Sequence, residues 1–149
     1  VQDASEVALG ETTTLDEGSL PAGNGWKEII FTPRSGRYVV IEAHDTHDGN
    51  PAAIAEIYLT DGAGNRLPSE KWKVLPTRDC NTAGNHTADK IIDLQESTYW
   101  EAASGTKPPH RLVIDLGEET AVGGFGYLPR MERGAPGALS RYRLSISQP

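Results

Sequence analysis

The chain has 149 residues, of which 37% are hydrophobic, and its formal net charge is −7. This length suffices for a hydrophobic core, so we expect one domain over residues 1–149, partly irregular over 1–24. No apolar run reaches the ~18 residues of a membrane-spanning helix, and the acidic charge argues against nucleic acid as a partner. Cys80 is the one cysteine, which excludes an internal disulfide. We expect its small side chain to be semi-buried.

Short runs rich in β-branched and aromatic residues predict the strands. In chain order these runs cover residues 26–32, 37–43, 55–60, 111–116, 122–128 and 142–147. The last run alternates most regularly, with Tyr142, Leu144 and Ile146 on one face. Residues 61–65 follow a predicted strand and have the composition of a turn. Many short strands without crossover helices predict an all-β protein, an antiparallel sandwich or barrel.

The sequence lacks the usual signatures of catalysis. It contains no G-x-S-x-G elbow, and Cys80 has no plausible His beside it. His44 and His47, in H-D-T-H, could offer a zinc ion two ligands, but no third ligand is indicated. A glycosidase needs two carboxylates across a cleft, and a small sandwich offers little cleft. We therefore expect a protein that is not an enzyme.

The stretch I-I-D-L-Q-E-S-T-Y-W, residues 91–100, begins and ends like a strand but has a polar break. Asp93, Gln95, Glu96 and Thr98 could supply several oxygen ligands to a calcium ion, which takes about six to eight. No EF-hand pattern is present, so the other ligands of such a site would come from distant segments. The residues alone leave both a solvated turn and a cation-binding loop open.

Several short motifs match one known family in order and spacing. They are Asp93, Thr98 and Trp100, then Asp115-Leu116-Gly117, then Tyr127-Leu128-Pro129-Arg130. Together they resemble the coagulation factor 5/8 type C (discoidin-like) domains, which include the family 32 carbohydrate-binding modules. The resemblance implies an antiparallel β-sandwich of the jelly-roll, galactose-binding-domain-like type.

The order of the segments differs from the order in that family. Residues 36–43 and 54–59 resemble segments that usually close such domains, yet here they come first. Residues 142–147, normally in mid-domain, end the chain. One circularly permuted domain explains this order, and a segment spanning two adjoining domains is the alternative. We favour the permuted domain because the two halves supply one full set of strands without duplicates.

The resemblance also implies a structural calcium ion between two distant segments. The implied ligands are the carboxylates of Asp93 and Glu56, the hydroxyl and carbonyl of Thr98, and the carbonyls of Ala55, Lys90 and Gln95. Leu94 departs from the family, which often has Gly at this position and therefore a less constrained loop.

Sugar-binding members of the family use loops at one end of the sandwich. They combine a His after the Trp, the Arg of Tyr-x-Pro-Arg, an Asn and an aromatic side chain. Here Arg130 is present, but Glu101 stands in the His position, and the Asn and the aromatic are missing. The resemblance leaves three alternatives: a module for a different glycan, a structural or protein-contact domain, and an enzyme. We favour the first, with these candidate ligand-binding residues: Arg130, Glu101, Arg133, His44 and His47.

The favoured interpretation is a non-catalytic carbohydrate-binding module stabilised by calcium. We expect it to belong to a larger secreted bacterial protein, with neighbouring domains and no membrane insertion. Trp100, Phe125 and Tyr127 are expected in the core. Trp26 and Trp72 are expected there too, although either could form an exposed platform. Arg130 could simply pair with Glu101 or Glu132 at the surface.

Overall fold

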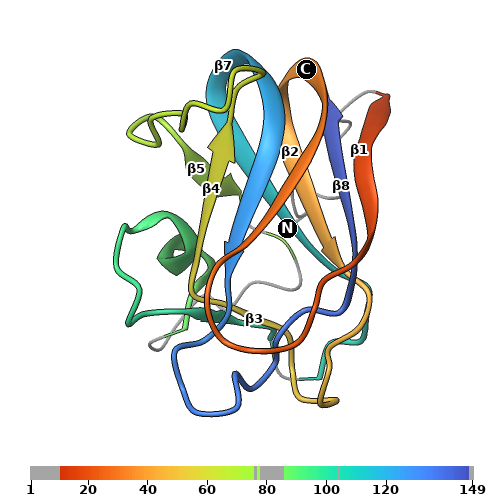
Figure 1. The fold of residues 1–149 in the computed structure, drawn as a ribbon, viewed down its shortest axis with the longest axis vertical. Helices are drawn as coiled ribbons and strands as arrows, with labels where there is room; N and C mark the ends of the chain where they lie inside the picture. The colour runs from red at the N-terminus through yellow and green to blue at the C-terminus, as the bar shows by residue number, and fades with distance from the viewer. Residues whose placement is uncertain (1–10, 76, 78–85, 104, 148–149) are drawn as a thin grey trace.

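The computed structural model describes residues 11–75, 77, 86–103 and 105–147. They form an all-β sandwich with two layers of antiparallel strands, which confirms the predicted fold class (Figure 1). The elements in chain order are β1 (Thr12–Ser19), β2 (Lys27–Ala43), β3 (Ala53–Ile54), β4 (Glu56–Thr60), β5 (Lys73–Leu75), the 3-10 helix η1 (Ala88–Ile92), β6 (Trp100–Glu101), β7 (His110–Leu128) and β8 (Arg141–Ser147). Cys80 lies outside the described residues.

Two long strands, β2 and β7, pair along their lengths and belong to both layers. Their register runs from Lys27 opposite Tyr127 to Ala43 opposite His110. It shifts between Ile30 and Arg34 and again beyond Gly36, and at these irregularities the strand pair bends over the top of the sandwich in Figure 1. The sequence predicted each of these strands as two separate runs, because the bend interrupts the alternation of apolar and polar residues.

The main sheet has the strand order β1-β8-β2-β7-β4, with β5 also paired to β7. The first part of β2, the last part of β7 and β4 form the layer nearer the viewer in Figure 1, called here the front layer. Two segments differ from the expectation. Thr12–Ser19 form β1 inside a segment expected to be partly irregular, and Ile91 and Ile92 belong to η1 instead of a strand.

The core between the layers contains the large side chains that the sequence assigned to it. Trp100, Phe125 and Tyr127 are each 1% exposed, as predicted. Trp72 is 8% exposed, whereas Trp26 is only partly buried. Burying a large apolar side chain contributes roughly 1.5–3 kcal/mol to folding, so this cluster is a major source of stability.

The described ends of the chain lie side by side. Thr12 of β1 stands opposite Ser147 of β8 in the antiparallel register. At the other end of the sandwich, the loops after β2, β6 and β7 gather near β3 (Figure 1). Among the described residues, no helix is long and apolar enough to cross a membrane.

Candidate functional site

The loop of residues 93–98, the ion-site loop, is closed by its own polar side chains. It begins at Asp93, where η1 ends. Oδ1 of Asp93 accepts a hydrogen bond from the Gln95 amide at 3.0 Å, and Oδ2 accepts one from the Thr98 hydroxyl at 2.5 Å. The same hydroxyl lies 3.1 Å from the Gln95 carbonyl oxygen. These contacts gather several oxygen atoms of the loop around one point.

Glu56 reaches this loop from β4. Its Oε2 accepts a hydrogen bond from the Leu94 amide at 3.3 Å, across 38 positions of sequence. The side chain is 5% exposed, and Oε1 has no hydrogen-bond partner among the described residues. Burial, together with the neighbouring Asp93 carboxylate, raises the pKa of Glu56 to about 8. A buried carboxylate oxygen without a partner is costly, so this arrangement suits a cation.

The remaining implied ligands lie on the segments that flank this pair. Ala55 is buried directly before Glu56, and its amide donates to the Leu128 carbonyl at 2.9 Å. The carbonyl of Lys90, in η1, accepts from the Asp93 amide at 3.5 Å. No group of three or more His, Cys, Asp or Glu able to hold a metal occurs among the described residues. The implied calcium ligands comprise two carboxylates and several neutral oxygens, so they do not form a group of that kind.

The two histidines of H-D-T-H do not converge. Nε2 of His44 lies 3.2 Å from Glu42 Oε1, whereas Nε2 of His47 lies 2.8 Å from the Leu20 carbonyl oxygen. His44 lines a cavity, whereas His47 ties its loop to the segment that follows β1. The two imidazole rings therefore have different partners and do not form one zinc site.

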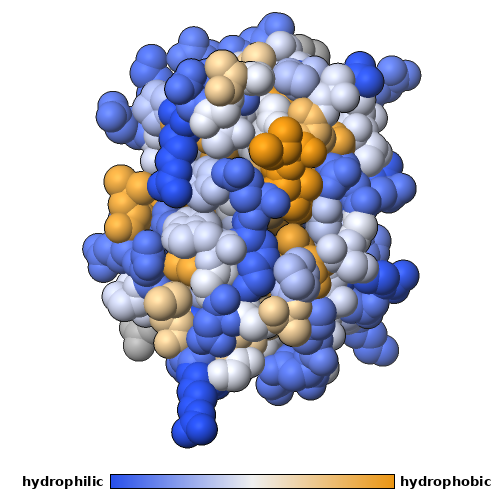
Figure 2. All heavy atoms as spheres, viewed as in Figure 1, coloured by the Kyte–Doolittle hydropathy of each residue, from blue (hydrophilic) through white to orange (hydrophobic). Residues whose placement is uncertain are grey.

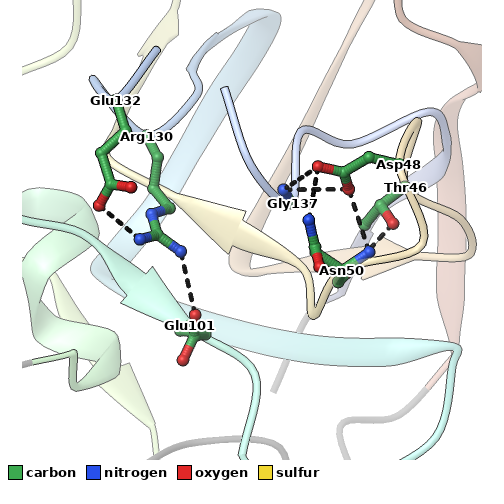
Figure 3. A network of polar contacts seen from close by, with 7 residues as sticks. All are labelled: Thr46, Asp48, Asn50, Glu101, Arg130, Glu132 and Gly137. Carbon is green, nitrogen blue, oxygen red and sulfur yellow. Dashed lines mark hydrogen bonds and ion pairs between the residues drawn. The ribbon is translucent and has the colours of Figure 1, made fainter. Parts of the chain in front are cut away.

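Arg130 lies just after β7, between the carboxylates of Glu101 and Glu132 (Figure 3), and we call this group the Arg130 cluster. Its guanidinium donates to Glu101 Oε2 at 3.1 Å and also pairs with Glu132. The same group lies 4.2 Å from the centre of the Tyr99 ring, which stacks on His86 with centroids 4.0 Å apart. The Arg130 side chain is 15% exposed, so two carboxylates and a ring already hold its charge.

A second polar network in Figure 3 joins the loop after β2 to the loop after β7. Asp48 accepts from the Asn50 amide at 3.0 Å, from the Asn50 side chain at 2.8 Å, and from the Gly137 amide at 3.3 Å. Gly137 has φ +73°, and a Cβ there would lie 2.2 Å from the Pro51 carbonyl oxygen. The close approach of the loops therefore requires glycine, and the network fixes one wall of the cavity described next.

The loops after β2 and β6 border an open cavity of about 380 Å³, which we call the loop-end cavity. Its polar lining residues are His44, Asp45, Thr46, Asn50, Thr106 and His110. Alanines, prolines and glycines complete the wall. This volume lies within the ~300–1,000 Å³ range of small-molecule sites, and polar groups among small apolar ones suit a hydroxylated ligand.

The predicted ligand-binding residues fall in separate places. His44 lines the loop-end cavity, while Arg130 and Glu101 form their own cluster beside it. His47 contacts Leu20, and Arg133 is exposed on the loop after β7. Sequence reasoning missed the other polar residues that line the cavity: Asp45, Thr46, Asn50, Thr106 and His110. The segment A-A-S-G-T-K-P-P after β6 could have indicated a cavity in the sequence, because its small residues leave space beside a loop.

The family motifs occupy structural positions at this end and along β7. Tyr127 is buried, and its hydroxyl donates to the Ala53 carbonyl and accepts from the Leu139 amide, both at 3.0 Å. Asp115 accepts from Arg37 Nε at 2.8 Å and from the Gly117 amide at 2.8 Å. Residues 76–149 match the family model of the F5/8 type C domain. The chain belongs to the F5/8 type C family.

Relatives of this F5/8 type C chain include two proteins named galactose oxidase, both from Gibberella zeae. Each is 31% identical to the chain over an alignment of 88 residues, and the match covers 56% of this chain. The matched part covers 12% of each relative's own length. The F5/8 type C chain therefore spans a small part of these relatives, and the comparison concerns one region of a much larger protein.

Proposed function

We propose that this domain is a non-catalytic carbohydrate-binding module whose sugar site is the loop-end cavity. The observation that carries the proposal is the cavity itself, about 380 Å³ in size, at the loop end of an F5/8 type C sandwich. Its imidazole, carboxylate, amide and hydroxyl groups can both donate to and accept from sugar hydroxyls. The small apolar residues between them can contact the carbon face of a sugar ring.

The neighbouring Arg130 cluster supports a ligand larger than one ring. Arg130 and Glu101 come from the same loop end as the cavity but do not line it. A glycan chain that leaves the cavity in their direction would meet the paired side chains of Arg130, Glu101 and Glu132. Arg133, exposed on the adjacent loop, could contact the same chain, whereas His47 would act by holding its loop in place.

We propose in addition that calcium binds between Asp93 and Glu56. The buried Oε1 of Glu56 and the oxygens gathered around Asp93 and Thr98 fit the ion's preference for carboxylate, hydroxyl and carbonyl oxygens. Ala55, Lys90 and Gln95 would add carbonyls. The ion would supply positive charge to two close carboxylates and join β4 to the ion-site loop.

The permuted order of segments is part of the proposal. The family model matches residues 76–149, which is the half that carries the usual beginning of such domains. A permuted chain explains why residues 1–75 lie outside that match. We further propose an extracellular parent protein with neighbouring domains; that its source is bacterial stays a prediction.

The matched relatives are named as oxidases, but the proposal for this chain is binding alone. The chain covers 12% of those relatives, and the loop-end cavity needs no reactive group to hold a sugar. Oxidation or hydrolysis of a bound glycan by the chain would contradict the proposal. An assay of released aldehyde and reducing ends would detect either reaction.

A glycan array followed by titration calorimetry tests the sugar site. His44→Ala and Thr106→Ala should each weaken binding about fivefold or more, since a lost hydrogen bond costs roughly 1 kcal/mol. Lys107→Ala is the matched control, because Lys107 is exposed beside Thr106 and does not line the cavity. Loss of binding only with Arg130→Ala would move the site to the Arg130 cluster.

A structural or protein-contact role is the second candidate. The observation that favours it is the internal pairing of Arg130 with Glu101 and Glu132, which occupies the arginine that sugar-binding relatives use. If the domain binds none of the plant, algal and host glycans on the array, this result would support the structural role and contradict the carbohydrate-binding proposal.

A further inference from the structure

Two aromatic side chains meet on the outer surface of the front layer, and neither of them lines the loop-end cavity. Trp26 directly precedes β2, and Tyr58 lies in β4. Their ring centroids are 5.0 Å apart with an angle of 49° between the planes, and both side chains are partly exposed. Figure 2 looks onto the front layer, where pale and orange side chains lie among blue polar ones.

Glycine in β7 determines where the Tyr58 ring lies. Tyr58 stands opposite Gly126 in the register, and a Cβ at Gly126 would be 2.1 Å from Tyr58 Cε2. The ring therefore extends across β7, and its hydroxyl donates to Glu28 Oε2 on β2 at 2.5 Å. Anchored at both ends, the ring has a fixed position on the surface.

Arg66 lies on the outer face of this ring. Its guanidinium carbon is 3.9 Å from the Tyr58 centroid and 5.6 Å from the Trp26 centroid. Arg66 is exposed, and no carboxylate among the described residues forms an ion pair with it. Tyr58 is therefore a positioning residue, which holds the guanidinium beside Trp26 with its N–H groups available to a ligand.

A shallow cavity of about 180 Å³ opens beside these side chains, and we call it with them the aromatic platform. Its lining residues include Trp26, Tyr58, Arg66, Ser69, Leu94 and Glu96. Its volume is below the ~300–1,000 Å³ of sites that enclose a ligand, so a ligand here would lie against the surface. None of these residues lines the loop-end cavity.

We propose that the aromatic platform is a second carbohydrate site, which binds a neutral sugar ring of a glycan chain. The Trp26 ring offers an apolar face to the C–H groups of the sugar. Arg66 donates to ring hydroxyls, while Ser69 and Glu96 can accept from them. Glu28 and Glu96 flank the site, so their negative charge disfavours a uronic acid.

The platform goes beyond the loop-end site and does not depend on it. Two sites on one module could engage the same polysaccharide, and the second contact would then be intramolecular with a raised effective concentration. Binding at either site without the other leaves the remaining proposal standing, because the two share no lining residue.

Nuclear magnetic resonance of the tryptophan indole N–H groups tests the platform. The chain has 3 tryptophans, and the Trp26 signal can be assigned with Trp26→Phe. The probes are neutral cello-, xylo-, manno- and galacto-oligosaccharides, each compared with oligogalacturonides. Neutral probes should shift the Trp26 signal. Trp26→Ala should weaken this binding about tenfold and Arg66→Ala about fivefold, whereas Trp26→Phe, which keeps a ring, should weaken it less.

Matched variants separate the two sites and guard against misfolding. Arg34→Ala removes another exposed arginine that lines neither site, so its affinity should equal that of the wild type. His44→Ala should leave the Trp26 shift intact. If Trp26→Ala does not fold, Arg66→Ala decides. The platform proposal is overturned if no neutral probe shifts the Trp26 signal, if only uronic acids shift it, or if Arg66→Ala binds like the wild type.

Discussion

Gly126 shows how one missing side chain shapes the front layer. It belongs to the segment V-G-G-F-G-Y-L, in which Phe125 and Tyr127 point into the core and Gly124 and Gly126 lie on the opposite face of the strand. The sequence predicted a strand here and placed both aromatic residues correctly in the core. It could not predict that Tyr58 fills the space above Gly126, because register between distant strands is set by tertiary packing.

Replacing Gly126 with alanine should destabilise the protein. The added methyl group would overlap the Tyr58 ring, and overpacking of this kind costs about 1–3 kcal/mol. Gly18→Ala is the matched control, since a Cβ there meets the Tyr142 hydroxyl at an ordinary 3.5 Å. Urea unfolding of the three proteins measures the difference. Equal midpoints for both variants would contradict the position of the Tyr58 ring.

At the scale of elements, only one of the two segments of the proposed ion site could be predicted from the residues themselves. Asp93, Gln95 and Thr98 are neighbours along the chain, so their polar cluster could be predicted locally. Glu56 lies on another strand, and only the family resemblance connected it with the loop. Leu94 adopts φ +61°, a left-handed conformation that favours glycine, so the loop follows a glycine-like path despite the substitution.

Removing calcium should lower the melting temperature if the ion binds between Asp93 and Glu56. At a calcium concentration 100 times the dissociation constant, binding contributes about 2.7 kcal/mol, or roughly 5–10 °C for a chain of this size. Differential scanning fluorimetry with and without a chelator measures the change. Asp93→Asn and Glu56→Gln should each abolish it, whereas Asp89→Asn, an exposed acid in η1, should retain it. An unchanged wild-type melting temperature after chelation would contradict the site.

Strand prediction succeeded where apolar and polar residues alternate in the sequence and failed where they do not. Residues 142–147 were assigned from alternation, and Tyr142, Leu144 and Ile146 are indeed buried in β8. In β1 only Leu15 is buried, so Thr12–Ser19 lack an apolar pattern. That strand exists because its backbone pairs with β8, a cause that composition does not reveal.

At the scale of the whole molecule, the two halves of the chain share one sheet. β8 pairs with β1 and β2, and β7 pairs with β2 and β4, so the second half depends on strands of the first. A shared sheet is the arrangement expected of one domain, whereas two adjoining domains would each need strands of their own. That the order of segments is permuted relative to the family stays a prediction.

Rearranging the chain tests this interpretation directly. A protein with residues 76–149 followed by 1–75 would have the segment order that the family resemblance implies. It should fold with a melting temperature within a few degrees of the original and the same calcium response, because Thr12 and Ser147 already lie opposite each other. The fragment 76–149 alone should be unfolded by circular dichroism and proteolysis, since β7 and β8 would lose their partners in β1, β2 and β4. A fragment 76–149 that folds stably by itself would favour two adjoining domains instead.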